Sequence, residues 1–203
     1  MENYRQVTSI VLAGGKSLRL GKSKALETIG GKSLIQRVVE RLTQISSQIL
    51  IVTSREYTDF PLDCEAEIKV DLYPDKGPLG GIYTGLTASQ SFYSIVVACD
   101  MPFLNTELLR YMIELSTGFD AVVPRLERLE PLHAVYSKSC LDMIRVQLDL
   151  NQLAIARFLD MANVRYVERD ECQRSDPQLL SFFNVNCRGD LNRAIQLAAG
   201  ERY

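Results

Sequence analysis

Residues 95–99, with the sequence IVVAC, are apolar at every position. A strand that faces water on one side alternates apolar and polar residues, whereas a strand covered on both faces is apolar throughout. We therefore predict that this segment is a central strand of a sheet with helices on both faces. No other stretch of the chain constrains the fold as strongly.

Short apolar runs alternate with segments of helical periodicity along most of the chain. Residues 34–42 place their apolar side chains on one helical face, and Ser33 with Gln36 predicts a capping box at the start of that helix. Further strands are predicted at 7–13, 49–53, 67–70, 94–99, 121–124, 164–168 and 182–185, with a strand–loop–strand unit at 124–136. Further helices are predicted at about 80–90, 105–116, 138–148, 151–161 and 190–199. This alternation is typical of βαβ units, so we expect an α/β fold with three αβα layers and a mostly parallel, doubly wound sheet. A single domain is expected to span residues 1–203.

Bulk charge and cysteine usage exclude several classes of function. The formal net charge is −2 and the isoelectric point is about 5.6, so there is no overall attraction for nucleic acid or an anionic membrane. The five cysteines form no CxxC pair, which favours scattered thiols over a zinc site or a disulfide framework. The apolar run at 10–13 is too short for a signal sequence or a membrane span, so a cytoplasmic protein is predicted.

The glycine-rich stretch at 14–24 invites comparison with an ATPase phosphate loop, because Gly-Lys-Ser occurs at 15–17, 21–23 and 31–33. A Walker A loop also needs a glycine five positions before the glycine of that tripeptide. Those positions hold Ile10, Lys16 and Leu26, so all three copies fail. The spacing G-x-G-x-x-G fails as well, and a hydride-transferring dinucleotide enzyme loses its main support.

The same stretch suits a different phosphate site. The predicted strand at 7–13 ends in Gly14-Gly15, where the backbone can approach a ligand with its N–H groups available. Arg19 and Lys24 follow on the same loop, with further positive charge at 16 and 22. Arginine can chelate phosphate oxygens and lysine can offset charge on a leaving pyrophosphate, so a triphosphate is the natural counterpart. The alternative is a solvated basic turn.

Two aspartates favour the triphosphate. Asp100 directly follows the apolar strand, and Asp71 follows a short strand ahead of a proline- and glycine-rich turn. Ligands bind at the carboxyl ends of strands in open α/β sheets. One carboxylate with substrate phosphates suffices for Mg²⁺, so we predict a magnesium site at Asp100. The alternative is that Asp100 only orders its loop.

These residues carry a resemblance to a known family. The stretch VLAGGKSLRLGKSKALETIGGKSLIQRVVERL at 11–42 resembles the opening of the nucleotide-diphospho-sugar transferase-like superfamily, and the molybdenum cofactor guanylyltransferases in particular. The resemblance continues in D-x(5)-GPLGGI at 71–82, ACDMPFL at 98–104, EPLHAVY at 130–136 and FFNVNCRGDLNRA at 182–194. It thus covers nearly the whole chain and implies a Rossmann-like fold of the nucleotide-diphospho-sugar transferase type.

The resemblance also implies roles for single residues. It implies GTP contacts for Leu12, Ala13, Gly14, Gly15, Lys24, Asp71 and Asp100, with Mg²⁺ on Asp100. Arg19, matched to the motif arginine, is expected on the β- and γ-phosphates, and Lys24, Arg19 and Asp100 form the expected catalytic set. One position departs from the pattern, because Ser23 stands where the family usually has an aspartate. A role for that acid in orienting Lys24 is therefore in doubt.

The implied reaction is transfer of GMP from GTP to molybdopterin or Mo-molybdopterin, with release of pyrophosphate. Transient contact with molybdoenzyme maturation proteins is a further partner that the resemblance raises. Three alternatives stay open: a nucleotidyltransferase using CTP on molybdopterin or an NTP on a sugar or alcohol phosphate, a non-catalytic GTP-binding module, and a flavodoxin-like domain. The flavodoxin-like alternative leaves the spacing from Gly14-Gly15 through Arg19 to Lys24 unexplained.

Three polar residues in the C-terminal half of the chain are expected to have structural roles. His133 is the only histidine, so it can form neither a metal triad nor a Ser-His-Asp set, and we expect a partly buried structural side chain. Asn184 and Asn186 precede the last predicted helix and are expected to be turn and cap residues.

Overall fold

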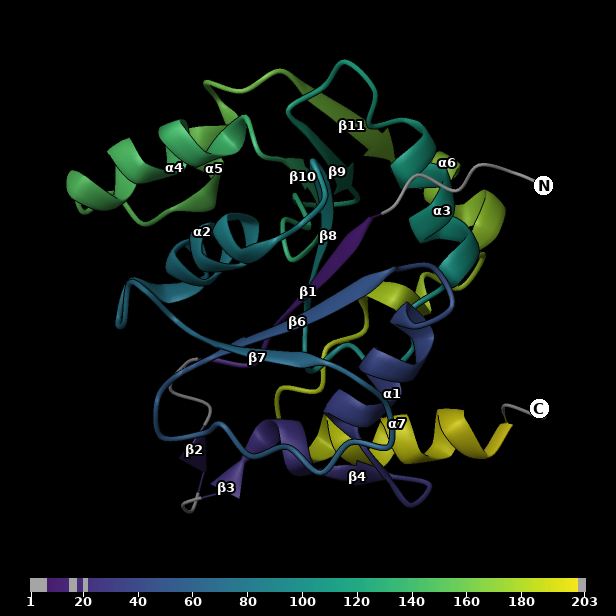
Figure 1. The fold of residues 1–203 in the computed structure, drawn as a ribbon. Helices are drawn as coiled ribbons and strands as arrows, with labels where there is room; N and C mark the ends of the chain where they lie inside the picture. Colours follow the sequence, from purple (N-terminus) through teal and green to yellow (C-terminus); the bar gives the residue numbers. More distant parts are fainter. Residues whose placement is uncertain (1–6, 15–17, 20–21, 201–203) are drawn as a thin grey trace.

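A computed structural model describes residues 7–14, 18–19 and 22–200. The strands of its central sheet are β1 (Thr8–Leu12), β6 (Gln48–Thr53), β7 (Glu67–Val70), β8 (Tyr93–Ala98), β9 (Ala121–Arg125), β10 (His133–Ser137) and β11 (Val164–Glu168). In the described part of the chain these seven strands form one sheet in the order β11-β9-β10-β8-β1-β6-β7 (Figure 1). Neighbouring strands are parallel except at β10, which is antiparallel to both β8 and β9. The predicted mostly parallel sheet and the strand–loop–strand unit are confirmed.

Helices cover both faces of this sheet. The apolar core on one face includes residues of α1 (Leu34–Leu42), α3 (Thr106–Glu114) and α6 (Arg169–Ser175). The core on the other face includes residues of α2 (Gly77–Ala88), α4 (Cys140–Asp149) and α5 (Ile155–Leu159). In β8, Ile95 and Val97 belong to the first core and Val96 to the second, which explains why this strand is apolar throughout. Among the described residues, no helix is both long and apolar enough to cross a membrane.

The order of the strands fixes where a ligand can bind. From β1 the chain passes through α1 to β6 and then β7 on one side, and it returns through α2 to β8 on the other side of β1. The connections therefore diverge between β1 and β8, and the crevice at the carboxyl ends of such a strand pair is where doubly wound sheets bind ligands. Gly14 and Asp100 follow these two strands.

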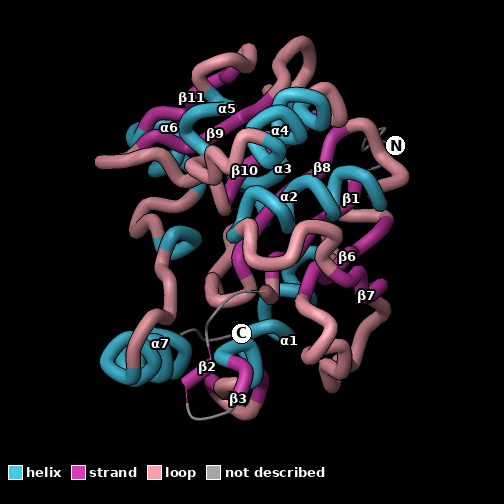
Figure 2. The backbone as a smooth tube through the Cα atoms, turned by 90° about the vertical axis from the view of Figure 1, so that its left-hand side faces the viewer, coloured by secondary structure: helices cyan, strands magenta, loops and turns pink. Residues whose placement is uncertain are grey.

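A smaller core lies at the same end of the molecule. Helix α7 (Arg188–Gly200) packs on the hairpin of β4 (Thr28–Ile29) and β5 (Lys32–Ser33), through buried residues that include Ile29 and Ala194. Figures 1 and 2 both place α7 at the end of the molecule that holds the hairpin of β2 (Leu18–Arg19) and β3 (Lys22–Ser23). That residues 1–203 form a single domain stays a prediction.

The capping box predicted for α1 forms only in part. Ser33 caps the helix and accepts a hydrogen bond from the amide of Gln36 at 3.2 Å. The side chain of Gln36 instead accepts from the amide of Asp63 and donates to Glu40. It therefore ties the helix to a neighbouring loop.

Apart from the short hairpins of β2 with β3 and of β4 with β5, three segments differ from the prediction. The strand expected at 182–185 is wrong, because the 3-10 helix η2 (Leu180–Phe182) is followed by irregular chain that is held by a bond from the amide of Val185 to the carbonyl of Asp100. The helix expected at 151–161 is reduced to α5, since Asn151 adopts a left-handed φ of 54°. Helix α6 was not predicted at all.

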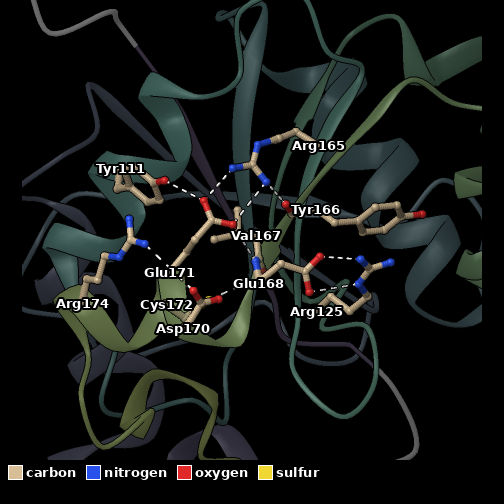
Figure 3. A network of polar contacts seen from close by, with 10 residues as sticks. All are labelled: Tyr111, Arg125, Arg165, Tyr166, Val167, Glu168, Asp170, Glu171, Cys172 and Arg174. Carbon is tan, nitrogen blue, oxygen red and sulfur yellow. Dashed lines mark hydrogen bonds and ion pairs between the residues drawn. The ribbon is translucent and has the colours of Figure 1, made fainter.

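Figure 3 shows the polar contacts at the start of α6. Glu168 and Glu171 make a capping box, although glutamate is not among the preferred N-cap residues, so the sequence carries no ordinary start signal. The Glu171 carboxylate also accepts hydrogen bonds from Tyr111 of α3 at 2.8 Å and from Arg165 of β11 at 2.6 Å. Tertiary contacts therefore fix this helix.

Candidate nucleotide site

The backbone after β1 lies between the ends of its two neighbours. The carbonyl of Leu12 accepts a hydrogen bond from the amide of Cys99 at 3.1 Å, and the amide of Ala13 donates to the carbonyl of Val52 at 2.9 Å. Gly14, the next residue, is exposed. The predicted main-chain segment Leu12, Ala13 and Gly14 thus ends at the divergence point of the sheet. Gly15 and the side chains of Arg19 and Ser23 lie outside the described residues.

Lys24 and Asp100 meet at this edge. Lys24 begins the 3-10 helix η1 (Lys24–Leu26), and its Nζ lies 2.6 Å from Oδ2 of Asp100, 76 positions away in the sequence. The other carboxylate oxygen, Oδ1, is buried and has no hydrogen-bond partner within the described ranges. The two side chains that a shared triphosphate would require are therefore brought together.

Asn186 is the site residue that sequence reasoning missed. Its side-chain oxygen accepts a hydrogen bond from Nζ of Lys24 at 3.0 Å. The bond between Val185 and the carbonyl of Asp100 brings this segment to the site. The expected capping role belongs instead to Cys187, whose Sγ accepts from the amide of Asp190, and to Asp190, whose Oδ2 accepts from the amides of Asn186 and Cys187. The aspartate at position 190 could have indicated this from the sequence, because its carboxylate can take the place of the Asn186 side chain at the start of the helix. Asn184 keeps a local role, donating to the carbonyl of Phe182.

Asp71 lies at the same edge, at the end of β7. Its Oδ1 accepts hydrogen bonds from the amide of Tyr73 at 3.0 Å and from the hydroxyl of Thr84 at 2.8 Å. Burial raises the pKa of the Asp71 carboxyl, and these two hydrogen bonds offset part of that rise. The turn after Asp71 packs tightly on α2, because a Cβ atom at Gly80 would lie 2.7 Å from the carbonyl oxygen of Tyr73.

Two other reactive side chains close to this edge, Cys99 and His133, are ill suited to chemistry there. All five cysteines are free thiols, and burial raises the pKa of Cys99 beside Asp100 to about 12, so it stays protonated. His133 is fully buried rather than partly buried as expected, because β10 is an inner strand of the sheet and the His133 ring packs on Phe182 with centroids 4.6 Å apart. Burial lowers the pKa of His133 to about 3.

Comparison with known proteins agrees with this geometry. Residues 9–167 match the model of the MobA-like NTP transferase domain. The chain belongs to the MobA-like NTP transferase family. The matched segment contains Leu12, Lys24, Asp71 and Asp100, whereas Asn186 lies beyond it.

Relatives of this MobA-like chain match it over nearly its whole length. A probable molybdenum cofactor guanylyltransferase from Pelotomaculum thermopropionicum is 37% identical, with 97% of this chain and 96% of the relative covered. The crystal structure of molybdopterin-guanine dinucleotide biosynthesis protein A from Archaeoglobus fulgidus superposes with a TM-score of 0.82 at 29% identity, covering 96% of this chain and all of that one. The 2-C-methyl-D-erythritol 4-phosphate cytidylyltransferase of Thermus thermophilus, at 16% identity, a TM-score of 0.72 and coverage of 96% and 99%, shares the fold.

Proposed function

We propose that this chain transfers the GMP unit of GTP to the terminal phosphate of molybdopterin or Mo-molybdopterin and releases pyrophosphate. The relatives named above support the reaction class and the substrates. The structural observation that carries the proposal is the pair of Lys24 and Asp100 at the divergence point of the sheet. It puts a cation for phosphate oxygens beside a carboxylate suited to a divalent metal. The substrates would be met in the cytoplasm, the location that the sequence predicts.

Asp100 fits a magnesium ligand. Mg²⁺ prefers oxygen ligands and is commonly held by one or two carboxylates together with substrate phosphates. Oδ1 of Asp100 is a buried oxygen without a partner in the described part of the chain, which is costly unless something else binds it. A cage made by the protein alone is not needed, and the described residues contain no group of three or more His, Cys, Asp or Glu side chains that could form one. Bound there with the nucleotide, Mg²⁺ would supply positive charge next to the α-phosphate.

The remaining residues would bind and orient the nucleotide. Main-chain groups from Leu12 to Gly15 would approach the guanine nucleotide, and Asp71 would make a further contact with GTP. Lys24, kept in place by Asn186, would stabilise the leaving pyrophosphate together with Arg19. An oxygen of the acceptor phosphate forms a bond to the α-phosphorus, and the bond from that phosphorus to the α,β-bridging oxygen breaks, so pyrophosphate departs with the electron pair. A phosphate monoester is already largely ionised near pH 7, so no general base is required.

The decisive experiment measures pyrophosphate release with molybdopterin and each of GTP, CTP, ATP and UTP in the presence of Mg²⁺. With molybdopterin as the acceptor, we expect pyrophosphate release from GTP and from none of the other three nucleotides, together with formation of the guanine dinucleotide. Release with CTP would identify a cytidylyltransferase instead, and release only with a sugar or alcohol phosphate as acceptor would change the substrate class. Thermal stabilisation by GTP without pyrophosphate would identify a non-catalytic GTP-binding module.

A further inference from the structure

The contact between Lys24 and Asp100 is sheltered. The side chains of Lys24 and Asp100 are only 17% and 18% exposed, respectively. Nζ of Lys24 also donates to Asn186, so the ammonium group has two oxygen partners on two separate segments. A pair held in this way is weakened by solvent and salt much less than an exposed pair. The ammonium group of Lys24 therefore competes with any other cation for the carboxylate of Asp100.

The carboxylate of Asp100 is where that competition arises. Oδ2 carries the ammonium group, and Oδ1 faces a buried environment with no partner among the residues that the structure describes. A divalent cation on this carboxylate would lie within a few ångströms of the lysine charge. Two like charges at that distance repel each other strongly where water is excluded. Lys24 and the metal thus disfavour each other unless the lysine charge acquires another anion.

A triphosphate is such an anion. Lysine is a mobile point charge on a flexible stem, so Nζ can exchange the carboxylate for phosphate oxygens without a change in the sheet. We infer that Lys24 couples the two binding events: it suppresses divalent-cation binding at Asp100 until the phosphates of a nucleotide draw its ammonium group away. The inference rests on the proposed function, since it takes Asp100 to be the metal ligand. Because coupling of binding free energies is reciprocal, the cation also favours the phosphate-bound position of Lys24.

Binding of Mn²⁺ without nucleotide tests the inference. Free Mn²⁺ is measured by electron paramagnetic resonance during titration of the wild type, Lys24→Met and Lys24→Met/Asp100→Asn. We expect Lys24→Met to bind Mn²⁺ at least about fivefold more tightly than the wild type, the lower end of typical coupling between sites. The matched control is Lys32→Met, which removes a lysine paired with Glu40 at 2.8 Å on an exposed surface and should leave the affinity unchanged. Lys24→Arg keeps a cation beside Asp100 and should also bind Mn²⁺ weakly.

The outcomes separate the coupling from the metal assignment. If Lys24→Met binds Mn²⁺ no more tightly than the wild type, yet the added Asp100→Asn change weakens binding, the coupling is wrong and the metal site stands. If the double variant binds Mn²⁺ as tightly as Lys24→Met, Asp100 is not the ligand and the metal part of the proposed function fails. Thermal unfolding of each variant establishes that it is folded, and Lys24→Gln replaces Lys24→Met if the latter is not.

Discussion

Gly85 in α2 lies so close to Ile10 in β1 that a Cβ atom added at Gly85 would be 2.4 Å from Cγ2 of Ile10. Real Cβ atoms do not approach another carbon so closely, so a side chain here would push α2 away from the sheet. The first turn of the same helix packs on the turn that follows Asp71. The contact between helix and strand therefore sets the position of one wall of the candidate site.

Gly85→Ala should destabilise the fold. Overpacking a well-packed core costs about 1–3 kcal/mol, which outweighs the gain of up to about 1 kcal/mol that alanine offers over glycine inside a helix. The control is Gly189→Ala in α7, where the new Cβ would meet only the sulfur of Cys187 at an ordinary 3.5 Å. Urea unfolding measures both variants. An unchanged free energy of unfolding for Gly85→Ala would contradict the close approach of α2 and β1.

Asp100→Ala should lower turnover by at least about a hundredfold, the scale seen when a preorganised electrostatic group is removed from an active site. The loss should persist at saturating GTP, since the missing charge acts at the reacting phosphate. Pyrophosphate release at saturating substrates measures it, with Asp59→Ala in an exposed loop as the control. Turnover near the wild-type value would remove Asp100 from the catalytic set.

Asp71→Asn should weaken GTP binding and raise the stability of the fold. Burial raises the pKa of Asp71, so ionisation is less favourable in the folded chain, and the wild type loses stability as pH rises from the ordinary aspartate pKa to the raised one. Asparagine carries no charge and its side-chain oxygen can still accept the bonds from Tyr73 and Thr84. We expect a higher melting temperature than wild type at pH 7, no such gain below the ordinary aspartate pKa, and GTP binding weakened about tenfold or more.

Calorimetric titration with GTP and thermal unfolding at several pH values test the two halves separately. A variant that is stabilised but binds GTP normally would show that Asp71 serves the turn and not the nucleotide. A variant that is destabilised at pH 7 would contradict the cost assigned to its burial.

The central strands, helix α1 and the ligand-binding edge of the sheet are predictable because the sequence patterns that indicate them are local. The apolar run in β8 and the helical face of α1 report burial directly, and a carboxylate placed just after β8 predicts a ligand edge. Each aspartate directly follows a predicted strand, so the amino-acid sequence alone suffices to place Asp71 and Asp100 at one edge of the sheet.

The unpredicted features depend on partners far away in the sequence. Asn186 lies 162 positions from Lys24, to which it is hydrogen-bonded. Apart from Asp190, which can serve the cap instead, nothing in the neighbouring sequence indicates that Asn186 contacts a distant side chain rather than forming a turn. Helix α6 depends on Tyr111 and Arg165 from other elements. The segment at 182–185 has strand-like composition, yet it lies outside the sheet and bonds to the loop at Asp100.

His133 should make the stability of the protein depend on pH. Both ring nitrogens are buried without a hydrogen-bond partner in the described ranges, and burial lowers the pKa of the ring to about 3. The folded chain therefore keeps the ring neutral, while the unfolded chain binds a proton below the ordinary histidine pKa. The free energy of unfolding should fall as pH decreases from about 6.5 toward 3, by up to about 1.4 kcal/mol per pH unit from this group alone.

His133→Leu removes the titrating ring and should flatten this part of the pH profile relative to the wild type. His133→Gln, also neutral at every pH in this range, serves as a second variant if leucine disturbs the packing against Phe182. Urea unfolding of all three proteins at half-unit steps between pH 4 and pH 7 gives the slope of the free energy of unfolding against pH. In about this range, residue 133 of the wild type titrates only in the unfolded chain. Carboxylates that titrate in the same range are common to all three, so they cancel in the difference. Equal slopes for wild type and both variants would mean that the ring takes up its proton in the folded chain as readily as in the unfolded one, contrary to its burial in β10.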